Sequence, residues 1–297
     1  AFYVCDTAIP QNRTEDLAIT SNLSGGDWEN RLKQELLLGI GGVRLLRILN
    51  IKPEVYHYNE GHAAFAGLER LLMLVQDENV SFDEALEIVR ASSLFTTHTP
   101  VPAGHDTFTE ELLRVYLAYH ANLLNISWKR LMALGRVNEN DVEEKFSMSL
   151  LATRISQAIN GVSAIHERVA RKMFSNLWKG YAEDELPIGH VTNGVHYPTW
   201  TAPAWQELHS KTFGDGFAAQ ISEPAYWKKI QEVPDKIIWD IHTKQKIMLL
   251  EEIKSRLQNE ITGQQKDVKP LLQQIDSLNE KTLIIGFARR FVTYKRS

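Results

Sequence analysis

Short β-rich runs that end abruptly in polar residues, with helical segments between them, constrain this chain more than any other feature. Val55-Tyr56 leads into His57-Tyr58-Asn59-Glu60-Gly61-His62, and Leu94-Phe95 leads into Thr96-Thr97-His98-Thr99-Pro100. Alternating strands and helices are typical of a mostly parallel α/β sheet, and ligands bind beyond the carboxyl ends of such strands. Two adjacent strand ends therefore predict one site, although either segment alone fits a turn or a helix cap equally well.

The periodicity of apolar residues predicts the individual elements. Helices are expected at residues 62–75, 85–91, 112–121, 163–174 and 237–258. Ser81 with Glu84 and Thr107 with Glu110 fit the capping-box pattern ahead of two of them. Asn160-Gly161 is typical of a turn. Strands are expected at residues 1–6, 54–58, 94–97, 146–152, 188–195 and 282–288.

Composition excludes several classes of function. The 297 residues carry a formal net charge of -4, so no strong field for nucleic acid is expected. A single cysteine, Cys5, rules out an internal disulfide and a cysteine-based zinc cluster, and it fits a cytoplasmic protein. No apolar run approaches the roughly 20 residues that cross a bilayer, and no signal peptide is visible.

The chain divides by composition, and both ends look cut. Tryptophans and long helical segments follow Tyr197-Pro198, which places a boundary near Tyr197. The apolar run at 282–288 predicts a buried strand, which needs neighbours on both edges. We therefore expect an internal fragment with three parts: residues 1–197, residues 198–281, and a final segment 282–297.

Several polar residues at predicted strand ends are candidates for binding or catalysis. His98 can offer a ring nitrogen to a substrate hydroxyl, or it can be a core histidine bonded to a carbonyl. The amide of Asn193 suits a sugar hydroxyl, although Asn-Gly is also a common turn pair. Arg290 and Lys295 suit phosphate oxygens, or they form a solvated charge run. His57, Glu60 and His62 lack the His-Glu-x-x-His spacing, so no metal site is expected.

Five segments together resemble one family, the α-glucan (glycogen, starch, maltodextrin) phosphorylases, and most closely its short bacterial and archaeal branch. They occur in the family's order, at residues 57–62, 95–105, 160–162, 187–196 and 286–296. The resemblance implies the two-lobed GT-B architecture with Rossmann-like lobes. The three parts would then be the later N-terminal lobe, the helical start of the C-terminal lobe, and its first strand with the phosphate segment. It also implies phosphorolysis of α-1,4-glucan to glucose 1-phosphate with retention at the anomeric carbon.

The same resemblance assigns roles to individual residues. It implies that His98 contacts the transferred glucose near its 6-hydroxyl, with its carbonyl near the oxocarbenium-like transition state, and that Asn193 shares that hydroxyl. Arg290 and Lys295 match the residues that hold the substrate phosphate. Asn59, Glu60 and His62 fall in the Asn-x-x-His pattern and are expected to line the substrate site. Gly25, Gly26 and Asp27 lie where the better-known branch has a gating loop, without a secure alignment.

Two departures limit what the resemblance carries over. Val292 stands where the better-known branch has histidine. The family's cofactor is pyridoxal 5′-phosphate, but the chain stops before the lysine that forms its Schiff base, and Lys295 is not that lysine. The fragment alone is therefore expected to be inactive, and the longer protein could be a homo-oligomer.

Two alternatives stay open. A nucleotide-sugar glycosyltransferase such as a glycogen synthase shares the architecture and also uses a basic pair after the first strand of its C-terminal lobe. A non-catalytic glucan-binding module would bind oligosaccharide without turnover. The expected partners in the main interpretation are α-1,4-glucan and inorganic phosphate, with neither nucleic acid nor membrane.

Overall fold

The computed structural model describes residues 2–22, 26–263 and 269–288. The chain forms two compact units, Ala1–Asn193 and Gly194–Ser297. Each unit has its own set of packed side chains. In the part of the chain that the structure describes, no helix is long and apolar enough to span a bilayer.

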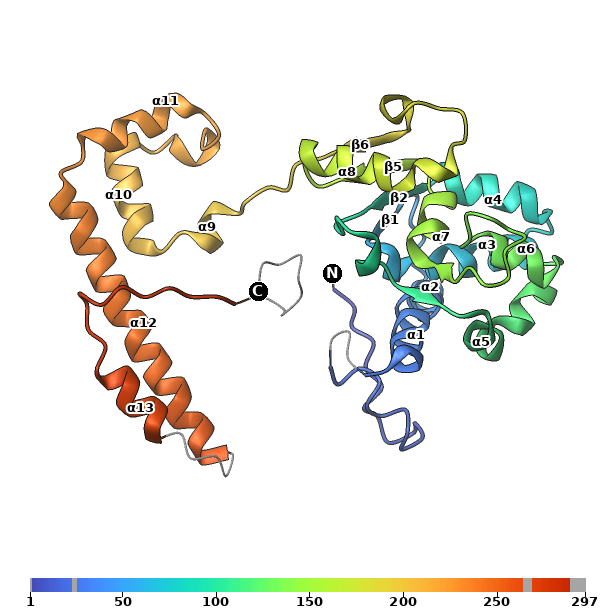
Figure 1. The fold of residues 1–297 in the computed structure, drawn as a ribbon, viewed down its shortest axis with the longest axis horizontal. Helices are drawn as coiled ribbons and strands as arrows, with labels where there is room; N and C mark the ends of the chain where they lie inside the picture. Colours follow the sequence, from blue (N-terminus) through green and yellow to red (C-terminus); the bar gives the residue numbers. More distant parts are fainter. Residues whose placement is uncertain (1, 23–25, 264–268, 289–297) are drawn as a thin grey trace. The chain divides into compact units, whose positions relative to one another are not determined.

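A four-stranded parallel sheet organises the first unit (Figure 1). Its order is β1-β2-β5-β6, and every neighbouring pair is parallel. The parallel α/β sheet predicted from the sequence is therefore confirmed. Because all four strands run in the same direction, their carboxyl ends share one edge. The strands are β1 (Tyr56–Asn59), β2 (Ser93–Thr96), β5 (Ala158–Gly161) and β6 (Ile188–His190).

Helices cover this sheet and enclose the core. Helix α8 packs along β5 and β6, and α4 packs along β2. Most of the helices begin at a capping side chain, as at Ser81, where the predicted capping box is present. The helices are α1 (Trp28–Leu36), α2 (Gly42–Ile48), α3 (Phe65–Asp77), α4 (Phe82–Ala91), α5 (Glu110–Leu123), α6 (Trp128–Ala133), α7 (Met148–Arg154) and α8 (Ala164–Phe174).

Short elements complete the first unit. A π-helical turn, η1, joins α1 to α2, and a two-stranded antiparallel sheet pairs β3 with β4. In the described part of this unit, four 3-10 turns lie in the connections between the longer elements. Their bounds are η1 (Leu37–Gly41), η2 (Gly61–Ala63), η3 (Pro102–Gly104), β3 (Thr107–Phe108), β4 (Phe146–Ser147), η4 (Ser175–Leu177) and η5 (Glu183–Glu185).

The core of the first unit depends on close approach of η1 to α3. A Cβ atom on Gly39 would lie 2.6 Å from the backbone nitrogen of Ala66 and 2.7 Å from the Cβ of Phe65. This contact explains a glycine inside a helical stretch, where it otherwise costs about 1 kcal/mol relative to alanine. Phe65, Leu71 and Phe95 are fully buried in the cluster behind it.

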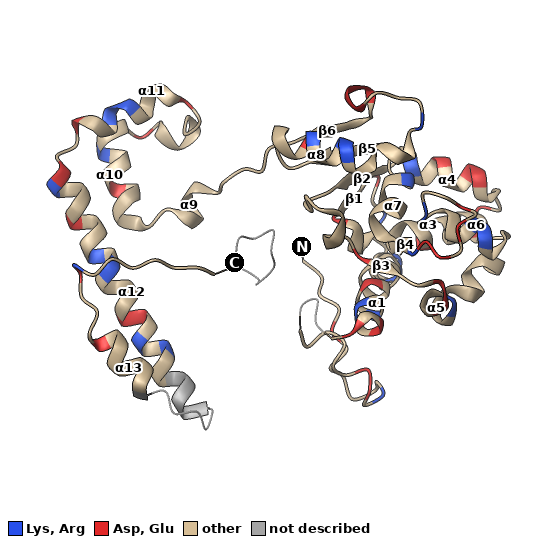
Figure 2. Cartoon of the chain, viewed as in Figure 1, with Lys and Arg blue, Asp and Glu red and all other residues tan. Residues whose placement is uncertain are grey.

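The second unit is helical and has an aromatic centre. His209 packs against Tyr197, Phe213 and Trp227. The hydroxyl of Tyr197 and Nδ1 of His209 are joined by a 2.8 Å hydrogen bond. Figure 2 shows basic and acidic residues interspersed along the long helix α12. The elements are α9 (Tyr197–Trp200), α10 (Pro203–Phe213), η6 (Phe217–Ala219), α11 (Pro224–Trp227), η7 (Lys228–Glu232), α12 (Asp235–Gly263) and α13 (Lys269–Asp276).

Three local predictions in the first unit are wrong. Thr107 lies in β3, and the α5 cap is Thr109, whose side chain accepts from the Leu112 amide. Residues 146–152, predicted as a strand, form β4 and most of α7, because the Ser147 side chain caps a helix there. The predicted Asn160-Gly161 turn is the end of β5, since pairing with both β2 and β6 overrides the turn preference.

The two predicted terminal strands are also wrong. Residues 2–6 and 283–288 form no strand. Leu283 and Ile285 are 83% and 86% exposed, although their sequence is that of a buried strand. A parallel strand gains its stability from hydrogen-bonded neighbours, and no strand in the described part of the chain pairs with these residues.

Candidate functional site

The segments that follow the four parallel strands are tied to one another by backbone hydrogen bonds. The Glu60 amide, after β1, donates to the Thr96 carbonyl at 2.8 Å, and the Thr97 amide, after β2, donates to the Asn160 carbonyl at 3.0 Å. After β6, the Asn193 amide donates to the Val162 carbonyl at 3.2 Å. The strand ladder thus continues beyond the strands and gathers Glu60, the chain before His98, and Asn193 at one edge.

Glu60 has an unusual backbone conformation. Its φ is 73° and its ψ is 167°, a region that is essentially restricted to glycine and costs about 1–3 kcal/mol for other residues. Such strain persists only where the surroundings impose it. The side chain of Glu60 supplies that constraint, because its carboxylate is fixed at both oxygens.

The Glu60 carboxylate holds the segment that carries His98. One oxygen accepts from the His98 amide at 2.8 Å and from the Thr99 hydroxyl at 2.9 Å. The other oxygen accepts from the Gly61 amide at 3.1 Å. Hydrogen bonds to an ionised carboxylate are the stronger kind. Glu60 therefore sets the position of the His98 backbone, and both oxygens of its carboxylate are engaged by these hydrogen bonds.

His98 presents its ring to solvent. Its side chain is exposed and makes no hydrogen bond to any residue that the structure describes. The interpretation of His98 as a core histidine is therefore wrong. With its backbone fixed and its ring unengaged, His98 can place an imidazole nitrogen against a ligand at the sheet edge.

A second histidine, His166, also holds the segment that carries His98 and Thr99, and it is not identified from the sequence. His166 is buried at the start of α8. Its Nδ1 accepts from the Val162 amide at 3.2 Å, which leaves Nε2 to donate to the Thr99 carbonyl at 3.2 Å. One neutral tautomer satisfies both bonds. The only local signal is the Ser163 cap three residues earlier, which indicates a helix start and no site.

Side-chain hydrogen bonds also link β1, β2 and β5 near their carboxyl ends. Thr96 donates its hydroxyl to Asn160 Oδ1 at 2.9 Å, so it accepts from His57 Nε2 at 2.7 Å. His57 is thereby occupied in bridging β1 to β2. Among the residues that the structure describes, no group of three or more His, Cys, Asp or Glu side chains could hold a metal ion.

Charged groups from α1 and the loop before β3 lie behind His62. Arg31 Nη2 lies 2.8 Å from Asp106 Oδ2, and Arg31 Nε lies 2.9 Å from Glu35 Oε1. Burial lowers the pKa of His62, and the positive charge of Arg31 lowers it further, against the opposing carboxylates of Glu60 and Asp106. His62 is therefore a neutral imidazole near pH 7.

Glu35 is the most perturbed acid in this part of the molecule. Its side chain is 1% exposed, and burial, followed by the negative charge of Asp106, raises its pKa to about 9. The Arg31 guanidinium opposes this shift without cancelling it. Glu35 is thus protonated at neutral pH and does not add a second charge beside Asp106.

The remaining predicted site residues divide into three groups. Asn59 ends β1 opposite Thr96 and is exposed, as is Asn193, so both amides are open to a ligand. Gly26 has a φ of +86°, and Asp27 caps α1 by accepting from the Asn30 amide at 2.8 Å. Gly25, Arg290, Val292 and Lys295 lie outside the described residues.

The donor set at the sheet edge suits a sugar. It consists of amides and an imidazole, which together donate to and accept from hydroxyl groups. Attachment of a pyridoxal aldehyde needs a lysine amine, and none of the residues placed at this edge is a lysine. The described residues alone therefore do not fit that cofactor, and no chemical step is assigned to it.

Comparison with known proteins decides the family. Residues 50–270 match the family of carbohydrate phosphorylases. The chain belongs to the carbohydrate phosphorylase family. It is 41% identical over 302 residues to the glycogen phosphorylase of Mycobacterium tuberculosis, and this alignment covers 98% of this chain and 34% of that protein.

Two further relatives agree with this family assignment. The maltodextrin phosphorylase of Thermococcus litoralis is 41% identical over 297 residues, covering 99% of this chain and 34% of that protein. The glycogen phosphorylase of Aquifex aeolicus is 33% identical over 294 residues, covering 99% and 42%. The phosphorylase resemblance seen in the sequence is confirmed. The chain spans about a third of the length of the first relatives it matches.

Proposed function

We propose that this chain contributes the glucosyl-contacting edge of an α-glucan phosphorylase, which cleaves α-1,4-glucan with inorganic phosphate to give glucose 1-phosphate with retention. The observation that carries the proposal is the strained Glu60, whose carboxylate fixes the backbone of His98 while the His98 ring stays unengaged. Pre-positioned groups of this kind favour a transition state because they need no reorganisation during reaction.

The proposed roles follow from what each group can do. The His98 imidazole and the Asn193 amide hydrogen-bond a hydroxyl of the transferred glucose, and Asn59 and His62 line the same pocket. The His98 carbonyl faces the positive charge that develops at the anomeric carbon. Glu60 is a positioning residue in this scheme. Arg290 and Lys295 hold the phosphate that replaces the glucan leaving group.

The finer architectural assignments are part of the same proposal. The first unit corresponds to the later part of an N-terminal Rossmann-like lobe, and residues 198–281 begin the C-terminal lobe of a GT-B protein. The phosphorylase family match over residues 50–270 supports the family membership on which this assignment rests. Pyridoxal 5′-phosphate is the cofactor expected of the complete protein. A cytoplasmic location is also proposed, on the basis of the cysteine content.

The test is an activity assay on the complete protein that carries this chain. Incubation with α-1,4-glucan and phosphate is expected to release glucose 1-phosphate as the α-anomer, which proton NMR identifies. No product is expected without phosphate. Transfer from a nucleotide sugar in place of phosphorolysis would favour the glycogen synthase-like alternative. Oligosaccharide binding without any turnover would favour the binding-module alternative.

A further inference from the structure

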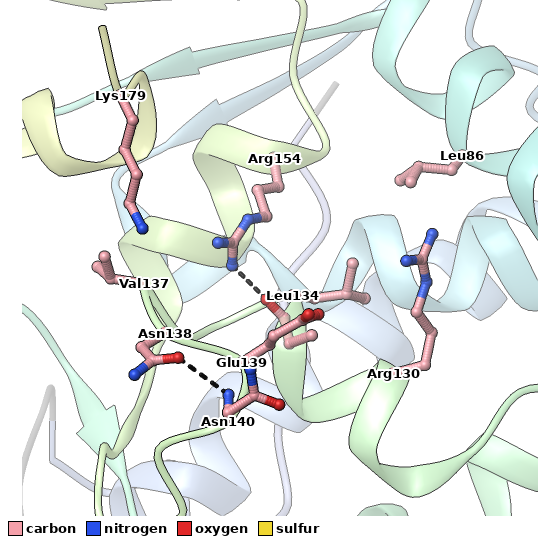
Figure 3. Close-up of a pocket in the computed structure, with 10 residues that line it drawn as sticks. Leu86, Arg130, Leu134, Val137, Asn138, Glu139, Asn140, Arg154 and Lys179 are labelled. Carbon is pink, nitrogen blue, oxygen red and sulfur yellow. Dashed lines mark hydrogen bonds between the residues drawn. The ribbon is translucent and has the colours of Figure 1, made fainter.

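A polar pocket in the first unit is lined by none of the strand-end residues. It has a volume of about 420 Å³ and is formed by the end of α6, the loop that follows it, Arg154 of α7 and Lys179 (Figure 3). None of its lining residues is Glu60, His98 or Asn193. Its size falls in the range of small-molecule sites.

Cations dominate the lining of this pocket. Arg130, Arg154 and Lys179 line it, with Glu139 as the only carboxylate among the lining residues. In Figure 3 the side chains of Arg154 and Lys179 extend into the pocket toward each other. Two like charges that converge in this way repel each other, whereas an anion bound between them would attract both.

Arg154 has no ion pair in the described part of the chain. Its Nη1 donates to the Ala133 carbonyl, which uses one of the five donors of a guanidinium. Burial lowers the pKa of Arg154, and the carboxylates of Glu144 and Glu139 compensate only in part. A half-buried cation without a close counter-charge gains free energy when an anion binds.

The other lining groups indicate which anion fits. Arg130 is paired with Asp83 at 2.9 Å and is therefore a secondary contact. Lys179 is exposed and forms no ion pair with a described residue. An arginine fork matches two oxygens of a tetrahedral oxyanion, and a lysine amine reaches a third. Asn138 and Leu134 also line the pocket, so a small organic group attached to the anion has a polar and an apolar side chain to contact.

We propose that this pocket binds a phosphate group, either inorganic phosphate or the phosphate of a sugar phosphate, with Arg154 and Lys179 as the main contacts. The proposal does not depend on the proposed phosphorolysis, because it concerns a different part of the first unit. A ligand at this site would stabilise the first unit by mass action.

The test is calorimetric titration of the full chain at constant ionic strength. The background is Arg290→Ala/Lys295→Ala, which removes the other candidate phosphate site. Inorganic phosphate and glucose 1-phosphate are the two probes, and the tighter binder identifies the source of the phosphate group. Lys179→Ala is expected to weaken binding about tenfold, as the loss of one charge-assisted contact does.

Two further variants make the result decisive. Arg154→Lys keeps the charge but loses the fork, and it is expected to weaken binding about tenfold as well. Lys172→Ala removes an exposed lysine of α8 outside the pocket, and it is expected to leave the affinity unchanged. The proposal is overturned if neither probe binds, if Lys179→Ala binds normally, or if Lys172→Ala weakens binding as much.

Discussion

Replacing Glu60 by glycine and by alanine separates its two roles, backbone strain and carboxylate clamp. Both variants lose the hydrogen bonds from Gly61, His98 and Thr99. Hydrogen bonds to a charged group contribute about 1.5–3 kcal/mol each at most, and this site is partly solvated. We therefore expect each variant to lose about 2–5 kcal/mol of unfolding free energy.

The two variants should nevertheless differ in stability. A glycine variant is usually less stable than the alanine variant, and here we expect the reverse. Alanine keeps the steric strain of a φ of 73°, which costs about 1–3 kcal/mol, whereas glycine is free of it. Glycine carries an entropic cost of about 0.5–1 kcal/mol. The net expectation is that Glu60→Gly is more stable than Glu60→Ala by about 0.5–2 kcal/mol.

Hydrogen exchange followed by mass spectrometry is the suitable assay, because it reports on β2 separately from the second unit. Glu87, exposed in the middle of α4, gives the matched control, and there the alanine variant should be the more stable one. The amide of His98 should exchange faster in both Glu60 variants. If Glu60→Ala is as stable as Glu60→Gly or more so, the strain argument is refuted.

Three further predictions concern other parts of the molecule. The pKa of Glu35 is raised to about 9 from 4.5, so its contribution to the free energy of unfolding is present below pH 4.5 and is lost as the pH rises toward 9, by up to about 1.4 kcal/mol per pH unit. In urea unfolding measured across this pH range, Glu35→Gln should remove the slope. An unchanged slope would show that Glu35 is ionised in the fold. Gly39→Ala should destabilise the first unit by about 2 kcal/mol or more, because the added methyl group overpacks against Phe65 and Ala66. Thermal unfolding measures this loss, and Gly42→Ala is the control because nothing lies within 4 Å of a Cβ there. Equal effects of the two substitutions would contradict the packing argument. Lys295→Ala in the complete protein should raise the KM for phosphate more than the KM for glucan, and unchanged phosphate kinetics in both Lys295→Ala and Arg290→Ala would leave this pair as a solvated charge run.

The sequence predicts the parallel sheet well because its signals are local. The strands predicted at residues 54–58 and 94–97 overlap β1 and β2, whereas the strand predicted at residues 188–195 is too long, because β6 ends at His190. The Ser81 and Glu84 side chains cap α4 as their spacing predicts. The sequence does not predict β5, because Asn160-Gly161 favours a turn in isolation. Burial of Ile159 between two neighbouring strands decides the matter, and that information lies outside the segment itself.

The site could be predicted only in part for the same reason. The residue types and strand ends point to His98 and Asn193, but the link from Glu60 to His98 joins residues 38 positions apart in the chain. The positive φ of Glu60 has no sequence signal, since glutamate is not a residue that favours it. His166 was missed because a buried histidine on a helix resembles any other core residue until its partners are known.

The most direct test of the proposed site is the kinetics of His98→Ala in the complete protein. The His98 ring is exposed and makes no hydrogen bond to a described residue, so the melting temperature should stay within about 1–2 °C of the parent value, as for most exposed positions. Loss of one transition-state contact costs about 2–4 kcal/mol, so kcat/KM for phosphorolysis should fall by about 30-fold to 1000-fold. Phosphorolysis at a near-parental rate in a folded His98→Ala protein would contradict the assignment of this sheet edge as the glucosyl site.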